Sequence, residues 1–169
     1  IHDLLLALGD LSVGDILDRT SQSQQAVLES MLSELSKARR IIEIRVAGHP
    51  RFIAAEDAAR YRDALGTVLP MGLPAALLEP CHSPLQDLIS RYIRTHGPFE
   101  PAELAKHFGL GIDVLRKALN ELSATGRVRE GGCTPGSTRR EWIDHDVLKQ
   151  LKRRSLAGWR QQIEAVDHN

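Results

Sequence analysis

The sequence is short of cysteines, aromatic residues and long apolar runs. Only two cysteines occur among 169 residues, aromatic residues make up 4%, and no apolar segment approaches the roughly 18 residues that a membrane span needs. Cys81 and Cys133 lie far apart, and the pair Cys81-His82 has no partner at a recognised metal-ligand spacing. We therefore expect no disulfide framework, no bound metal, no membrane partner and a reducing, cytoplasmic setting.

Motifs for nucleotide and catalytic chemistry are also absent from the sequence. It contains no G-x-x-x-x-G-K-[ST] loop to hold a nucleoside triphosphate, and no acidic pair whose spacing suggests metal-assisted chemistry. We expect no catalytic residues, no cofactor and no enzyme activity from this chain alone.

Charge is balanced overall but divided unevenly along the chain. The sequence has 22 Lys/Arg and 22 Asp/Glu: residues 1–79 carry 8 and 11, a net charge of −3, whereas residues 80–169 carry 14 and 11, a net charge of +3. A positive surface suitable for phosphates is therefore expected in the second half.

The second half has the pattern of three helices followed by a β-hairpin. Apolar residues recur at helical spacing over 83–95, 101–108 and 112–124, with Pro101 opening the second helix and glycines at 109 and 126 closing the second and third. The strings "RVRE" and "TRREWID" flank a Gly/Pro loop and predict a hairpin, with a last helix from Asp144 to about Ile163. This order is typical of a winged-helix module.

The first half contains a fainter copy of the same module. "LSELSKARRIIEI" overlays "LNELSATGRVREG" at an offset of 87 residues, and "LGDLSVGDIL" overlays "HGPFEPAELA" at an offset of 88. A capping box at Ser12 and a hairpin turning at Gly48-His49-Pro50 are predicted. Because Ile1 falls opposite the interior of the second module's first helix, we expect the chain to be a piece of a longer protein.

We therefore predict a mainly α (α+β) protein of tandem winged-helix modules: residues 1–68, truncated at the N-terminus, and residues 83–169, with a basic C-terminal helix. Residues 69–82 are predicted to be a buried connector that packs the modules together, and the alternative is an ordinary loop with one helical turn at residues 75–78. Trp142 is expected to pack in the core rather than stack on a base, and Trp159 to pack against the bundle or face a partner.

Ten polar residues of the second half form the predicted nucleic-acid-binding set. Arginine and lysine neutralise phosphates, and arginine can bind them bidentately. The alternative for each group is a solvated surface or a contact with protein. The residues are Arg116, Lys117 and Asn120 on the third helix, Arg127, Arg129, Arg139 and Arg140 on the wing, and Lys149, Lys152 and Arg153 on the last helix.

The two modules differ at the position of the third helix. Arg116 and Lys117 fall opposite Glu29 and Ser30 in the overlay, so only the second module is expected to contact phosphates.

Three strings, "FIAAEDAARYRDALG", "RYIRTHGPFEPAELAKHFGL" and "GRVREGGCTPGSTRREWIDHDVLKQLKRRSLAGWR", closely resemble the region after the helicase core in Lhr-type (large helicase-related) superfamily 2 proteins of bacteria. The resemblance implies winged-helix modules in a cytoplasmic, nucleoid-associated parent that hydrolyses ATP, translocates on nucleic acid and takes part in DNA repair.

We therefore expect an accessory region that binds DNA without sequence specificity. Single-stranded DNA, duplex DNA and RNA remain open as ligands, and the rest of the helicase chain is an expected partner. The alternative is a scaffold that links the helicase core of the parent protein to its C-terminal region, or a surface for self-association. A sequence-specific regulator is disfavoured because such proteins usually dimerise on palindromes.

Overall fold

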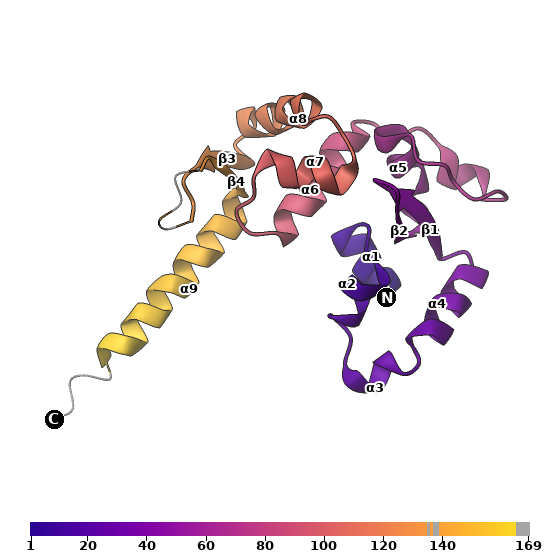
Figure 1. The fold of residues 1–169 in the computed structure, drawn as a ribbon, viewed down its shortest axis with the longest axis horizontal. Coiled ribbons are helices and arrows are strands. Elements are labelled where there is room, and N and C mark those ends of the chain that lie inside the picture. Colours follow the sequence, from indigo (N-terminus) through magenta and orange to yellow (C-terminus); the bar gives the residue numbers. More distant parts are fainter. Residues whose placement is uncertain (135, 137–138, 165–169) are drawn as a thin grey trace.

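The computed structural model describes residues 1–134, 136 and 139–164, which form a mainly helical chain with two small β-hairpins (Figure 1). The first half contains α1 (His2–Leu8), α2 (Val13–Leu17), α3 (Gln22–Gln25), α4 (Leu28–Lys37), β1 (Ile41–Val46), β2 (His49–Ala54), η1 (Ala55–Asp57) and α5 (Ala58–Leu65). The second half contains η2 (Ala75–Leu78), α6 (Pro84–Thr95), α7 (Pro101–Phe108), α8 (Ile112–Ala124), β3 (Val128–Gly131), β4 (Glu141–Asp144) and α9 (His145–Glu164).

Both halves repeat one local architecture, in which the residue before the second helix joins the hairpin. Leu11 pairs with Phe52 of β2 and Phe99 pairs with Trp142 of β4, each through two backbone hydrogen bonds of 2.8 and 3.0 Å. The next residue in each half, Ser12 or Glu100, caps the following helix in a capping box. The fold class is confirmed: the chain is mainly α, with two copies of a helix-turn-helix unit that carries a β-hairpin wing.

The three helices predicted for the second module lie where the sequence pattern placed them, whereas the second strand of the hairpin is shorter than "TRREWID" and comprises only Glu141–Asp144. Pro101 begins α7, and Gly109 ends it at φ 67°. The buried face of α8 consists of Leu115, Ala118, Leu119 and Leu122. Trp142 is 5% exposed and belongs to the core, as expected.

The predicted position of the first hairpin's turn is wrong by one to two residues. His49 and Pro50 are part of β2, and the turn itself consists of Ala47 and Gly48. Both turn residues have positive φ, 49° and 81°, which the right-handed twist of a two-residue hairpin favours. The turn was expected at Gly48-His49-Pro50, but His49 and Pro50 pair with Val46 and Arg45 of β1.

The expectation of a buried connector is also wrong. No residue of 69–82 is buried, and Met71 is 97% exposed, although Leu69, Leu73 and Leu77 pack partly against the core. The alternative is confirmed, since residues 75–78 form the one-turn helix η2. The exact division of the chain at residues 68 and 82 remains our proposal.

Direct packing of the modules takes the place of a buried connector. Helix α5 lies along α6, and one hydrophobic cluster combines Ile44, Val46 and Tyr61 of the first half with Leu88 and Ile93 of the second. A second cluster, built from Leu5, Ile16, Leu28 and other residues, belongs to the first half alone.

The turn of the first hairpin also contacts the second module. Gly109, at the junction of α7 and α8, lies so close to Ala47 that a Cβ built on the glycine would be 3.0 Å from the Ala47 Cα. The tip of the first wing therefore touches the second module, although Ala47 and Gly48 remain exposed.

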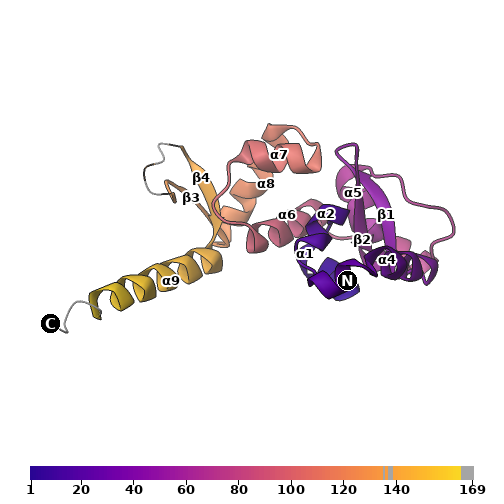
Figure 2. The same ribbon diagram turned by 60° about the horizontal axis from the view of Figure 1, so that its bottom comes forward.

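Helix α9 extends away from the rest of the chain (Figures 1 and 2). Its start is fixed by Asp144, whose Oδ1 accepts hydrogen bonds from the backbone N–H groups of Asp146 and Val147, as the sequence predicted. Leu151, Leu156 and Trp159 are 42%, 60% and 69% exposed, so Trp159 does not pack against the bundle. Among the described residues, no helix is long and apolar enough to cross a lipid bilayer.

Candidate nucleic-acid interface

Helix α8 presents a polar face opposite its buried stripe. Arg116, Lys117 and Asn120 are all exposed, and their spacing of three and four residues places them beside one another on the helix surface. Within the described part of the chain, Arg116 and Lys117 have no ion-pair partner. Both charges are therefore available to an anionic ligand.

The corresponding helix of the first module lacks these charges. Helix α4 carries Glu29 and Ser30 at the equivalent positions, and both are exposed. This difference leaves the second module as the better candidate for phosphate contacts.

Two of the four wing arginines are bound to carboxylates. Arg139 donates a hydrogen bond of 2.6 Å to Glu100, the residue that caps α7, and this bond raises the pKa of Arg139. Arg140, the residue before β4, lies 4.0 Å from Glu130 of β3. These two residues brace the wing, whereas Arg127 and Arg129 are exposed and form no ion pair among the described residues.

Two cations of the wing and of α9 act on one thiol. Burial and the charge of Glu141 raise the pKa of the Cys133 thiol, and the charges of Arg129 and Lys152 act in the opposite direction. Arg129 belongs to β3 and Lys152 to α9.

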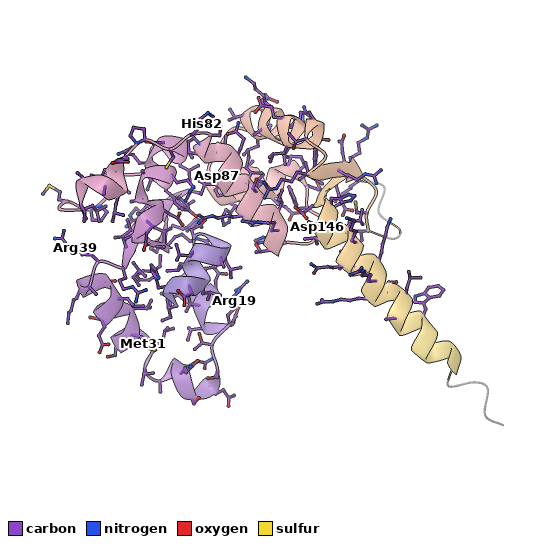
Figure 3. All side chains as sticks on the ribbon, turned by 180° about the vertical axis from the view of Figure 1, so that it is seen from behind. Arg19, Met31, Arg39, His82, Asp87 and Asp146 are labelled. Carbon is purple, nitrogen blue, oxygen red and sulfur yellow. The ribbon has the colours of Figure 1, made fainter. Side chains whose placement is uncertain are left out.

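The remaining basic residues of α9 differ in their pairing. Lys149 is 3.6 Å from Asp146, which Figure 3 shows at the start of α9. Arg153 is exposed, one helical turn after Lys149.

The ten predicted residues therefore form three groups rather than one compact patch. In Figures 1 and 2, α8 lies to one side of the β3–β4 hairpin and α9 leaves from the other. A single ligand that touched all three groups would have to pass along the hairpin.

The sequence analysis missed a cluster of polar residues between the two modules. Tyr61 donates a hydrogen bond of 2.9 Å to Asp10, and His107 of the second module lies 3.2 Å from the same carboxylate. Burial alone would raise the pKa of Asp10, but the hydrogen bond and charge of His107, with Tyr61 and Arg51, lower it below its usual value. Burial and the Asp10 charge raise the pKa of Tyr61 well above its usual value.

A second polar contact between the modules involves Asp57, which is 2% exposed. Arg91 of α6 donates to both of its carboxylate oxygens, and Arg60 donates to one of them. Arg60 also bonds to Asp87 at 3.2 Å, which Figure 3 shows at the boundary between the modules. No local pattern identifies these residues, because each pair joins helix surfaces that are remote in the sequence.

Comparison with known proteins is consistent with this geometry. Residues 1–80 match the family model described as "Large helicase-related protein, winged-helix domain". A protein of Mycolicibacterium smegmatis named "Lhr helicase/ probable uracil glycosylase" is 39% identical over 166 residues, which are 98% of this chain and 11% of that protein. "Lhr helicase/uracil glycosylase" of Escherichia coli is 35% identical over 166 residues, 98% of this chain and 10% of that protein.

The chain thus spans about a tenth of the length of these curated relatives. The family model matches residues of the first module and the connector, whereas the two relatives match nearly the whole chain, second module included. Residues 1–80 thus carry the winged-helix domain of large helicase-related (Lhr) proteins, and nearly the whole chain is similar to a segment of two Lhr helicases.

Proposed function

We propose that this chain is an accessory DNA-binding region of an ATP-dependent DNA helicase of the Lhr type, with a role in DNA repair. The second module binds DNA through phosphate contacts and without sequence specificity. The first module braces it through the shared core. The chain alone is expected not to hydrolyse ATP.

The pair of uncompensated charges on α8 is the observation that carries this proposal. Arg116 and Lys117 sit on an exposed helix face, and the equivalent face of the duplicated module has Glu29 and Ser30. Duplication provides an internal comparison: the same fold occurs twice, and only the second copy has a basic pair at this position of the helix, where it could neutralise phosphates.

A double variant tests whether the basic pair on α8, and not the shared fold, is responsible for DNA binding. Arg116→Glu with Lys117→Glu is expected to weaken binding of a labelled 20-base-pair duplex several-fold and to flatten its salt dependence, because each lost phosphate contact lowers the slope of log K against log salt by about 0.9. The matched control is Glu29→Gln with Ser30→Ala in α4. Equal losses from the two modules would contradict the assignment.

A role in protein contacts is the second candidate, and the projecting helix α9 favours it. Leu151, Leu156 and Trp159 are exposed on α9, where a neighbouring part of the helicase or a second copy of the chain could cover them. Light scattering at increasing concentration distinguishes self-association from a monomer, and Leu156→Lys should abolish any association that uses this face.

A further inference from the structure

A small cavity lies between the modules, apart from α8, the wing and α9. It has a volume of about 140 Å³ and is bounded by α1, α2 and β2 of the first module and by α6 and α7 of the second. Its lining includes positive and aromatic side chains from both modules, among them Arg19, Arg51, Tyr92, His96 and His107.

The rings of Tyr92 in α6 and of His96, the residue that caps the end of α6, form a stacked pair at this cavity. The rings of Tyr92 and His96 lie 3.7 Å apart between centroids, with planes inclined by 7°. The imidazole is fixed in this orientation because its Nδ1–H donates to the Tyr92 carbonyl at 2.7 Å. Since Tyr92 covers one ring face and His96 is exposed, the other face of the imidazole is open to a planar ligand.

A positive charge stands beside this ring. Burial lowers the pKa of His96, and the nearby charges of His107 and Arg19 lower it further. Arg19 is exposed, and its guanidinium donates only to the Asp15 backbone carbonyl, at 2.8 Å, among the described residues. Figure 3 shows Arg19 at the edge of the first module nearest the end of α6. The guanidinium can therefore accept an anion next to the exposed ring.

The two acidic groups of the cavity share one arginine. Arg51 lies 3.7 Å from Asp10 and 3.0 Å from Asp15, and the Asp10 side chain is 4% exposed. Arg19 at the rim forms no ion pair among the described residues, although its charge helps to lower the pKa of Asp15. A second hollow of about 400 Å³ shares Arg51 with the first and adds the exposed Lys106 and Glu103.

The size of the cavity limits the ligand. Its volume is well below the roughly 300–1,000 Å³ of pockets that enclose drug-sized molecules, so it suits one planar ring rather than a folded cofactor. An aromatic platform beside cationic side chains is the arrangement by which proteins hold single-stranded nucleic acid.

We propose that this boundary pocket binds one unpaired nucleotide of a nucleic-acid strand, with the base stacked on His96 and the adjoining phosphate on Arg19. The site is separate from the phosphate contacts proposed for α8 and the wing, since those need no unpaired base. Because residues of both modules form the pocket, an unpaired nucleotide bound there would contact both modules at once.

A fluorescent base at one position of a single strand tests the proposal. The probe is a ten-nucleotide oligothymidylate with one central 2-aminopurine, whose emission falls when the base stacks on a ring. The 169-residue chain should quench this emission on binding. His96→Ala should abolish the quenching and weaken binding about tenfold, the effect expected for loss of one stacked base. Arg19→Ala should weaken binding and lower the salt slope by about 0.7.

Matched controls lie on the far side of the molecule. Arg39 and His82 are exposed (Figure 3), and neither lines the cavity, so Arg39→Ala and His82→Ala should leave quenching and affinity unchanged. An unaltered circular dichroism spectrum checks that each variant is folded.

The outcomes separate this proposal from the one for α8. Duplex binding without quenching of the single-stranded probe would overturn the pocket and leave the α8 surface standing. Quenching that survives both His96→Ala and Arg19→Ala, or that the control variants reduce equally, would also overturn it. Quenching that persists in the Arg116→Glu, Lys117→Glu variant while duplex binding falls is the result expected if both sites exist.

Discussion

Asp57 of the first module accepts hydrogen bonds from the guanidinium of Arg91 in the second module at both of its carboxylate oxygens. The carboxylate is 2% exposed and also receives Arg60. Burial lowers the pKa of Arg91, but the bond to Asp57 outweighs this and leaves it raised. A bidentate arginine–carboxylate contact fixes both distance and angle, so this pair holds α6 against the first module in one orientation.

Removing the carboxylate should strongly destabilise the chain. We expect Asp57→Ala to lower the free energy of unfolding by about 3–5 kcal/mol, because two arginines are left around a buried site without a counter-charge. Urea denaturation followed by Trp142 fluorescence and by circular dichroism measures the effect. Both probes should shift together, since one hydrophobic cluster spans the modules. Asp146→Ala, at an exposed ion pair of α9, should change the midpoint little.

The contact between the first wing and the α7–α8 junction can be isolated with two glycines. Gly109 and Gly66 both end helices at positive φ, 67° and 65°, so an alanine at either is strained by about 1–2 kcal/mol. Only at Gly109 would the new Cβ meet backbone, 3.0 Å from the Ala47 Cα, whereas nothing lies within 4 Å at Gly66. We expect Gly109→Ala to cost measurably more than Gly66→Ala in thermal unfolding. Equal losses of stability in the two variants would mean that the tip of the first wing moves away from the new methyl group at no measurable cost in free energy.

Lowering the pH should remove the contribution of Asp10 to the stability of the folded chain. Its pKa is lowered in the folded chain, so its contribution to stability is present above the unfolded pKa of about 3.9 and is lost as the pH falls through the lower folded value. Asp10→Asn should reduce stability at pH 7 by about 1–3 kcal/mol. The difference from the unaltered chain should shrink toward pH 2–3. Urea midpoints at several pH values measure it, and a difference independent of pH would exclude an ionised Asp10.

Local patterns predicted the fold well where each element has its own signal. The apolar stripe of α8, Pro101 at the start of α7 and the glycine at its end are read from neighbouring residues, and the repeat reappears as matching capping boxes at Ser12 and Glu100. The turn of the first hairpin was misplaced because strand register depends on the pairing partner, which periodicity does not specify.

The boundary between the modules was not predictable in the same way. His107 and Asp10 are 97 residues apart in the sequence, and an isolated aspartate before a capping box has no distinctive spacing. The connector was misjudged for a related reason: an apolar stretch indicates burial, but the packing of α5 on α6 already closes the core. The basic residues were found as a set, and only their carboxylate partners separate Arg139, Arg140 and Lys149 from the rest.

The two lysines of α9 give the sharpest test of whether this helix follows DNA. Lys149 already lies beside Asp146, whereas Lys152 forms no ion pair among the described residues. A lysine that neutralises a phosphate contributes about 0.9 to the slope of log K against log salt, and one already paired with a carboxylate contributes less. Lys152→Ala should therefore lower the slope for duplex DNA by about one, and Lys149→Ala by distinctly less, when fluorescence anisotropy is measured between 50 and 200 mM salt. If neither substitution changes the slope, α9 does not contact phosphates. Its exposed leucines and Trp159 would then mark it as the part of the second module that contacts another protein surface.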